Sequence, residues 1–562
     1  MICPSLTANA PFALLLLMLL LALLLLGFAA ADTSIHTHDA SFTPDFVLRV
    51  TAQNFSQACY ERYSTIINGS SPGPEIRLQE GTTSWIRVYN DMEDLNLTMH
   101  WHGLTMMVAP FSDGTPLASQ WPIPPSHFFD YEIHAEEGYA GTYFYHSHVG
   151  FQAVSASGPL IISEPPSTNA TATTTTNTIP HEYDDERIIY LSDFFAKTDA
   201  EIERGLTSTN FSWSGETDAV LVNGQGRTAS NATGECQLAS IDVDPGKVYR
   251  LRFIGATALS FVSLALQDHA FAIIAADGKY TQPYNTSILQ IASGQRFDVL
   301  LQTRTLDELN GTTQFYFQLT TLERPITSTF FAALTYNTST TSPDLITVPS
   351  PPPLPIASTV PGWLDYALQP LTPSPDFPTL SEVTRRITIR MHQNITKTAT
   401  DPDYLVWLQG GLSPNTSSNS GEGVPWTASF PSTPYLVSIY ESTYPFAAAY
   451  NAALANAGLD TTTRTYPCKM NEVLEIVLQN AAATNGGLDT HPFHAHGGHY
   501  FDLGGGNGTY DAVANEARLA AQNAQPVKRD TTVVYRYIPR VEAPGTELGW
   551  RAWRLRVSDP GV

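Results

Sequence analysis

Basic residues are scarce in this sequence. It contains 29 Lys and Arg residues against 53 Asp and Glu residues, so the formal net charge of its 562 residues is -24 at pH 7. A surface of that sign repels phosphate backbones and anionic membranes. The charge balance therefore argues against nucleic acid as a partner.

Charged residues are few overall, at 15% of the chain, whereas 40 prolines and 37 glycines are present. Many turn-forming residues together with few charged ones favour an all-β protein over a helical one. At about 150 residues per domain, the length predicts three or four domains.

Only one long hydrophobic run is present, PFALLLLMLLLALLLLGFAA at residues 11–30. It predicts a signal peptide over residues 1–31 with cleavage near Asp32, because small residues follow the run in an A-x-A pattern. No Lys or Arg precedes the run, and its length approaches the ~18 residues at which an uncleaved membrane anchor becomes the alternative. No other stretch is apolar enough to span a bilayer.

Potential glycosylation sites point to the same compartment. Twelve N-x-S/T sequons occur, at Asn54, Asn68, Asn96, Asn169, Asn210, Asn231, Asn285, Asn310, Asn337, Asn394, Asn415 and Asn507. Together with the signal segment they predict a secreted, extracellular glycoprotein with no membrane association beyond that segment.

Cysteine is rare, with four residues in the whole chain. Removal of the signal peptide takes Cys3 away and leaves Cys59, Cys236 and Cys468. An odd number of cysteines cannot all pair within one chain.

Two compositional breaks divide the mature chain. A Ser, Thr and Asn-rich connector covers residues 165–180, and a Pro-rich spacer covers residues 341–363. The breaks predict domains at 32–165, 181–340 and 375–562, with a linker over 341–374.

Short β-branched or alternating runs bounded by turn residues predict sandwich strands at 81–90, 129–138, 247–256, 296–303, 472–480 and 530–538. Ala-rich stretches at 444–458 and 510–524 are the candidate helices.

Histidines gather in three short stretches, HWHG at residues 100–103, HSH at 146–148 and HPFHAHGG at 491–498. Residues i and i+2 of a strand point to one face, so each HxH pair presents two parallel imidazoles. His494 and His496 share a face if the segment is extended, whereas His491 faces the other way and is expected to serve a second site. Imidazole suits copper, zinc and iron alike, so ligand type alone does not select the metal. The alternative is a set of surface or core histidines bonded to their neighbours.

These motifs resemble the copper-binding signatures of multicopper oxidases. HWHGL followed by DGT and SQWPI, GTYFYHSHVGFQ followed by SGPLII, and HPFHAHGGHYFDL look like three of the four signatures of that family, closest to its ascorbate oxidase-like and fungal laccase-like branch. INGSSPGPEIR, LVNGQGR, VYRLRFIGAT, AADGKYTQPY and EVLEIVLQNA extend the resemblance over nearly all of the mature chain. The resemblance implies three cupredoxin-like Greek-key β-sandwich or barrel domains.

The resemblance also implies ligand roles for copper. His100 and His494 match the two ligands of the type 2 copper, and His491 matches a ligand of the blue type 1 copper. Four of the six ligands of the paired type 3 coppers are matched by His102, His146, His148 and His496. Asp113, in the turn after the first motif, matches an acidic residue that helps to supply protons to oxygen, although an Asp before Gly is often only a turn former.

The family's fourth motif, W-x-x-HCH-I-x-x-H, does not occur in the sequence. Residues 549–562 resemble the strand that leads into it, so we expect the third domain to be incomplete, with an unpaired sheet edge. The type 1 Cys and two type 3 histidines are then missing, and the chain as written is expected not to complete a catalytic cycle. An incomplete gene product and a genuine short form both explain this ending.

The cysteines fit the same resemblance. Cys59 and Cys236 match a bridge between the first and second domains, whereas Trp121 stands where the family has the Cys of another interdomain bridge. Cys468 is then either a small buried hydrophobe or the partner of a cysteine further along the gene product.

The predicted function is that of an oxidase that takes single electrons from a phenolic, pigment-precursor or ascorbate-like substrate and reduces O₂ to water. The alternatives are a non-catalytic copper-binding glycoprotein and an Fe(II) oxidase, although no cluster of Asp or Glu surrounds His491 in the sequence. A zinc hydrolase also uses HxH pairs but needs an open site with three ligands and a nucleophilic water. Clusters at both ends of the chain argue against it.

Overall fold

The computed structural model describes residues 38, 41–164, 180–207, 212–228, 236–324, 326–338, 346–356, 364–391, 413–414, 430–480, 490–522, 524–535 and 549–557. The predicted signal segment 1–31, most of the 165–180 connector, parts of the Pro-rich spacer, residues 558–562 and five sequons (Asn169, Asn210, Asn231, Asn394 and Asn415) lie outside the described residues. Contacts divide the chain into two units, Met1–Pro44 and Asp45–Val562, and all that follows concerns the second.

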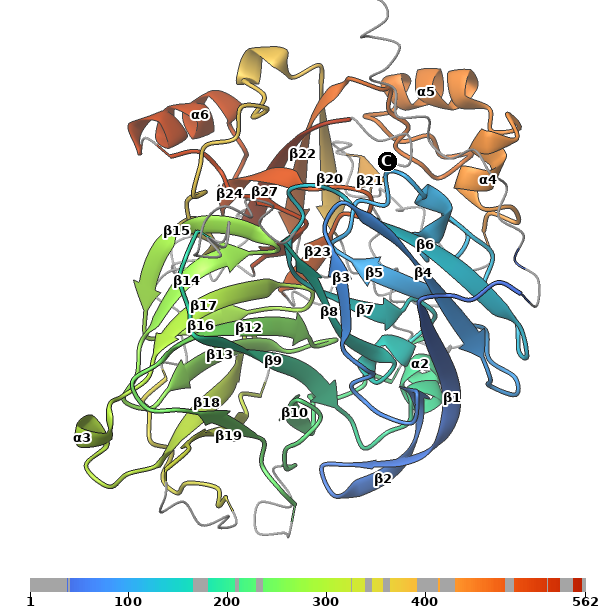
Figure 1. Ribbon diagram of the computed structural model, residues 1–562. Coiled ribbons are helices and arrows are strands. Elements are labelled where there is room, and N and C mark those ends of the chain that lie inside the picture. The colour runs from blue at the N-terminus through green and yellow to red at the C-terminus, as the bar shows by residue number, and fades with distance from the viewer. Residues whose placement is uncertain are drawn as a thin grey trace, which may run out of the picture. The chain divides into compact units, whose positions relative to one another are not determined.

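Residues 46–163, the first β region, form two four-stranded sheets, coloured blue to teal in Figure 1. The sheet with the order β2-β1-β4-β6 contains β1 Phe46–Gln57, β2 Tyr60–Ile67, β4 Thr82–Asn90 and β6 Phe128–Ala135. The sheet with the order β3-β8-β7-β5 contains β3 Ile76–Gln79, β5 Met99–His102, β7 Gly141–Ser147 and β8 Ser157–Ser163, and the short helices are η1 Pro110–Ser112 and η2 Gln152–Val154. Alternate residues of β6 are buried, as expected for a sheet with one face in the core.

Residues 185–336, the second β region, form a six-stranded and a five-stranded sheet. The order β10-β9-β12-β17-β14-β15 joins β9 Asp185–Phe194, β10 Ala219–Val222, β12 Val248–Ala256, β14 Phe271–Ala276, β15 Lys279–Thr286 and β17 Arg296–Gln302. The order β11-β19-β18-β13-β16 joins β11 Ser240–Val243, β13 Phe261–Leu266, β16 Leu289–Ile291, β18 Gln314–Leu322 and β19 Thr329–Tyr336. The helices here are α2 Asp199–Thr207 and α3 Leu306–Leu309. A large apolar core of Leu, Ile, Val and Phe side chains involves strands of both sheets.

Residues 385–556, the third β region, contain a six-stranded sheet and a two-stranded sheet. The order β21-β20-β22-β27-β24-β25 joins β20 Arg385–Met391, β21 Ser413–Pro414, β22 Val473–Asn480, β24 Tyr500–Asn507, β25 Lys528–Arg529 and β27 Gly549–Arg556, and the small sheet pairs β23 His491–His494 with β26 Thr531–Val534. The helices of this part of the chain are η4 Leu364–Tyr366, η5 Leu380–Glu382, α4 Tyr435–Tyr440, α5 Phe446–Ala455 and α6 Ala512–Ala521.

The predicted all-β fold is confirmed, and so are the predicted strands, which appear as β4, β6, β12, β17, β22 and β26, although residues 536–538 of the last one lie outside the described residues. Both Ala-rich helices are present as α5 and α6. The strands of each β region fall inside one of the predicted domains, whose boundaries at 32–165, 181–340 and 375–562 stay a prediction.

The last described strand is not at the edge of its sheet, and the incompleteness of the third domain, with an unpaired sheet edge, stays a prediction. Residues 549–556 form β27, which pairs with β22 on one side and with β24 on the other. In a Greek-key sheet the order of the strands in space differs from their order in the sequence. The last described strand therefore lies between two strands that precede it in the chain. The backbone of β27 therefore finds hydrogen-bond partners on both sides.

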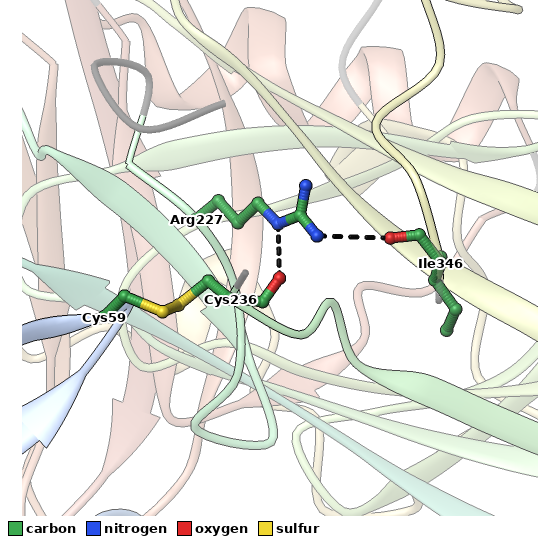
Figure 2. Close-up of a disulfide and its surroundings, with 4 residues drawn as sticks. All are labelled: Cys59, Arg227, Cys236 and Ile346. Carbon is green, nitrogen blue, oxygen red and sulfur yellow. Dashed lines mark hydrogen bonds between the residues drawn. A yellow bond between two sulfur atoms is a disulfide. The ribbon is translucent and has the colours of Figure 1, made fainter. Parts of the chain in front are cut away.

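A disulfide links the first two β regions (Figure 2). Cys59, in the turn between β1 and β2, is bonded to Cys236, which precedes β11, and the two Cα atoms are 5.5 Å apart. The Arg227 guanidinium donates to the Cys236 carbonyl and, at 3.3 Å, to the Ile346 carbonyl. The pairing is the one that the resemblance implies.

The surface features agree with a glycosylated protein. The seven sequon asparagines that the structure describes are all exposed, namely Asn54, Asn68, Asn96, Asn285, Asn310, Asn337 and Asn507. Within the described part of the chain, none of the helices has the length and apolar character that crossing a bilayer requires.

Candidate metal centre

Two histidine pairs of the first β region lie on adjacent antiparallel strands. β5 pairs with β7 in a register that places His100 opposite His146, and their ring centroids are 5.3 Å apart. His102 lies two residues along β5 and its ring is 5.7 Å from that of His146. His148 follows the end of β7, and its ring is 5.7 Å from that of His100. The i, i+2 spacing therefore brings four imidazoles to one face, as the sequence predicts.

The third β region brings two more imidazoles to the same place. The His494 ring stacks on that of His102 with a centroid separation of 3.7 Å, and the His496 ring lies 3.9 Å from that of His100. The rings of His148 and His496 are 5.1 Å apart. Six of the seven predicted histidines thus form one cluster from segments almost 400 residues apart in sequence; His100 and His494, for example, are separated by 394 residues.

Hydrogen bonds to oxygen acceptors fix which ring nitrogen carries the proton. His100 Nδ1 lies 2.7 Å from the Asp113 carbonyl oxygen, and His494 Nδ1 lies 2.9 Å from that of Asp530. A carbonyl oxygen only accepts, so each Nδ1 donates and each Nε2 keeps a lone pair. The two Nε2 atoms lie 3.2 Å apart.

This arrangement fits a cation better than it fits the bare protein. Two facing lone pairs repel one another, whereas two nitrogens that each bind one ion at about 2.0 Å can lie up to ~4 Å apart. Nε2 of His102 is buried and has no hydrogen-bond partner within the described residues. Potential ligand atoms of His100, His102 and His494 lie within 4.8 Å of one another, as do those of His100, Asp113 and His496.

Burial keeps five of the six imidazoles neutral, those of His100, His102, His146, His148 and His494. Burial lowers the pKa of His148 to about 3 and that of His494 to about 4. Burial also lowers the pKa of His100, and it places the pKa values of His102 and His146 well below the ordinary range. At neutral pH these imidazoles are uncharged, which is the form that binds metal ions.

Asp113 lies at one side of the cluster. Its Oδ2 accepts from His496 Nδ1 at 3.0 Å and from the Thr115 hydroxyl at 2.5 Å. Burial raises the pKa of Asp113, but the neighbouring His496 and His100 outweigh it and hold that pKa well below its usual range. The turn is tight, because Gly114 has φ +84° and a Cβ there would lie 1.8 Å from the Met99 carbonyl oxygen. Asp113 is therefore both a turn residue and a neighbour of two cluster histidines.

His491 is separate from the cluster. It begins β23 opposite Val534, three residues before His494, so the two side chains leave opposite faces of the strand. The strand thus directs the His491 side chain away from the face that carries His494, and its place at a second site stays a prediction.

Two cavities reach the cluster. One of about 320 Å³ is lined by His102, His146, His148, His494 and His496 together with apolar residues that include Phe144, Phe151 and Pro492. The other, of about 890 Å³, has Asp113, Thr115 and His496 in its wall, beside apolar residues that include Tyr435, Tyr466 and Cys468. His496 lines both, so small molecules can approach the cluster from two sides.

Sequence reasoning missed the acidic and basic residues behind the cluster. Asp530 was only the first residue of a predicted strand, yet its Oδ1 lies 3.7 Å from His102 Nε2. His499 follows the third histidine motif, is buried, and has its Nε2 3.1 Å from Asp530 Oδ2. Arg296, from β17, forms an ion pair with Asp530 at 2.6 Å. No local pattern predicts these contacts, because those of Asp530 with His102 and Arg296 join different β regions and that with His499 joins residues far apart in the sequence.

Comparisons with known proteins agree along the whole chain. Family profiles described as multicopper oxidase match residues 49–167, 185–339 and 431–540. Laccase-like multicopper oxidase 1 of Thermothelomyces thermophilus is 44% identical, over 93% of this chain and 84% of that protein. Multicopper oxidase aurL2 of Gibberella zeae is 41% identical, over 96% and 88%. L-ascorbate oxidase of Cucumis sativus is 28% identical, over 90% and 83%.

Solved structures show the same fold. The crystal structure of Fet3p, a multicopper oxidase that functions in iron import, matches with a TM-score of 0.65 and 20% identity, over 92% of this chain and 86% of that one. The laccase of Botrytis aclada matches with a TM-score of 0.62 and 19% identity, over 92% and 83%. These neighbours are three-domain cupredoxin-fold proteins, so the predicted fold class is confirmed.

Proposed function

This chain belongs to the multicopper oxidase family, and on that premise we propose that the protein couples the one-electron oxidation of a small phenolic reductant to the reduction of O₂ to water. A polypeptide of residues 1–562 alone, without the type 1 Cys and two of the type 3 histidines, is expected not to complete that cycle. Multicopper oxidases use O₂ and a reducing substrate. The oxidation of a phenol releases single electrons, whereas O₂ takes up four on its way to water. Bound copper ions supply that chemistry by accepting electrons one at a time and passing them to oxygen.

One observation carries the proposal, namely the facing Nε2 atoms of His100 and His494, 3.2 Å apart. The oxygen acceptors behind each ring hold the Nδ1 protons of His100, His146 and His494. Their unprotonated Nε2 atoms are therefore available as ligands. Such outer hydrogen bonds orient metal-binding imidazoles and raise their basicity.

We assign the ligands accordingly. His100 and His494 would share one copper, and four further rings would hold the copper pair, namely His102, His146, His148 and His496. His491, on the other face of β23, would serve the outer copper that collects electrons. No cysteine in residues 1–562 has histidine neighbours, so we expect a polypeptide of these residues to bind Cu(II) without an intense thiolate-to-copper visible band.

Asp113 is proposed to deliver protons. Its carboxylate touches His496 and Thr115, and all three residues line the 890 Å³ cavity. The Asp113 carboxylate lies between this cavity and the cluster, so it can take up a proton from the cavity and release it to oxygen at the cluster.

We infer the class of reducing substrate from the names and identities of the relatives. The 44% identical relative is named laccase-like, whereas the ascorbate oxidases are 28% identical, so we place phenols before ascorbate. An extracellular site of action is supported by the signal-like segment 1–31, the exposed sequons and the Cys59–Cys236 disulfide.

Oxygen uptake by the protein purified from its native source tests the proposal. A phenol should support uptake with four electrons consumed per O₂ and no hydrogen peroxide released, and it should do so better than ascorbate or Fe(II). Copper bound to the purified protein without any oxygen uptake would instead support a non-catalytic copper-binding glycoprotein.

A further inference from the structure

We propose that Asp530, clamped by Arg296, is a positioning residue for the histidine cluster: it sets the orientation of His494 and holds the three β regions in register before copper binds. The inference rests on the proposed function, because it concerns the same copper ligands.

The backbone of Asp530 directs the third histidine motif. Its carbonyl oxygen accepts from His494 Nδ1 at 2.9 Å and from the Ala495 amide at 2.9 Å. Two donors from adjacent residues converge on one oxygen, so a shift of Asp530 moves the ring of His494 with it. The orientation of His494 Nε2 toward His100 is therefore set by where Asp530 lies.

The Asp530 side chain is fixed by a two-point ion pair. Arg296 Nη1 donates to Asp530 Oδ1 and Nη2 to Oδ2, each at 2.6 Å. The Arg296 and Asp530 side chains are 0% and 1% exposed. Parallel bonds from a planar guanidinium restrict both distance and rotation, which a single contact does not. Asp530 Oδ2 also lies 3.1 Å from His499 Nε2.

Arg296 connects this carboxylate to the other two β regions. Its Nε donates to the Thr142 carbonyl of β7, the strand that carries His146, at 3.1 Å. Its Nη1 donates to the Gly294 carbonyl at 3.0 Å, and Gly294 lies against the ring of His102. One guanidinium thus contacts a segment beside each group of cluster histidines.

The glycine of the HWHG motif is explained by the same pair. Gly103 follows His102 with φ +96°, and a Cβ there would lie 2.4 Å from Arg296 Nη2 and 2.9 Å from Asp530 Oδ2. The chain after His102 therefore passes directly over the ion pair. Any side chain at this position would displace either the pair or β5.

A buried ion pair can also be purely structural, so the test needs a matched control. Glu475 and Arg554 form such a pair in the third β region, 2.8 Å apart, and both side chains are 0% exposed. They lie on β22 and β27 and contact none of the cluster histidines in the contacts that the structure describes. Glu475→Gln therefore removes a comparable charge without touching the proposed copper ligands.

The experiment compares Asp530→Asn and Glu475→Gln in the 562-residue chain. Asn has the size of Asp, but its amide NH₂ cannot accept a hydrogen bond. The variant therefore loses one of the two hydrogen bonds that Arg296 donates to residue 530. We expect both variants to melt earlier than wild type in the copper-free form. Asp530→Asn should also lose about 10- to 100-fold in Cu(II) affinity, measured by chelator competition. The EPR spectrum of its bound Cu(II) should change, whereas Glu475→Gln should keep wild-type affinity and spectrum.

A folded Asp530→Asn variant with wild-type copper affinity and EPR spectrum would overturn the inference. If that variant does not fold, Arg296→Lys takes its place, because Lys keeps the charge but bonds only one carboxylate oxygen at a time. Wild-type affinity in Arg296→Lys would overturn the inference equally. A wild-type chain that binds no Cu(II) would instead contradict the proposed function itself.

Discussion

The first and third β regions supply the histidine cluster in different ways. His100 and His102 lie on β5, which pairs with β7 in an antiparallel register, and their side chains are 1% and 5% exposed. His494 and His496 lie at the end of β23 and just beyond it, and their side chains are 16% and 29% exposed. The first region therefore contributes the two fully buried rings of the site, on β5, in addition to the partly buried His146 and His148. The third contributes a more accessible half whose placement depends on Asp530 and on contacts with the other regions.

Removal of one ligand from each half tests this difference most strongly. His100→Ala should lose more copper affinity than the roughly 10- to 100-fold that loss of an outer contact costs, because no other described ring can take its place on β5. His494→Ala should lose less, since the His494 side chain is 16% exposed against 1% for that of His100, so water can take the place of the missing imidazole as a ligand. Chelator competition on both variants gives the two affinities. Equal losses, or a larger loss for His494→Ala, would remove the distinction between the halves.

Substitutions at two glycines test the contact between the chain that follows β5 and the Arg296–Asp530 ion pair. Gly103 and Gly81 both have positive φ, +96° and +75°, but a Cβ at Gly81 has no atom within 4 Å. We expect Gly81→Ala to cost about 1–2 kcal/mol from backbone conformation alone. Gly103→Ala should cost more than about 3 kcal/mol, because it also displaces a buried ion pair.

Urea denaturation gives both free energies of unfolding, and copper affinity should fall only in Gly103→Ala. Equal costs for the two variants would show that the Arg296–Asp530 pair does not restrict β5.

Acidification affects the buried histidines of both halves. Burial lowers the pKa of His148 to about 3 and that of His494 to about 4, against an unfolded value near 6.5. The unfolded chain therefore binds more protons than the native one below pH 6.5, so stability falls as the pH drops from 6.5 toward 4. The melting temperature of the copper-free protein should decrease over this range. His148→Gln should weaken that decrease, and an unchanged slope in the variant would contradict the assignment of His148 as a buried neutral imidazole.

Much of the first half could be predicted from sequence, because its determinants are local. The i, i+2 spacing of His100 and His102 and of His146 and His148 defines one face of each strand, and the structure places them as expected. Residues 491–494 form a strand, as the parity argument for His491 and His494 assumed, while the place of His491 at a second site stays a prediction. The strands and both Ala-rich helices followed from composition and alternation for the same reason.

The supporting contacts could not be predicted in this way. Arg296 and Asp530 are 234 residues apart, and neither carries a local pattern that distinguishes it from an ordinary charged residue. The role of Gly103 depends on that ion pair, so it could not be predicted from the sequence either. The central position of β27 depends on strand order, which the alternation of one strand does not contain.

Anomalous diffraction at the copper absorption edge, from crystals of the copper-loaded 562-residue chain, tests the central claim most directly. We expect a peak within about 2.0–2.1 Å of both His100 Nε2 and His494 Nε2, so that one ion joins the first and third β regions. Copper found only on ligands from a single region, with those two nitrogens unligated, would contradict it.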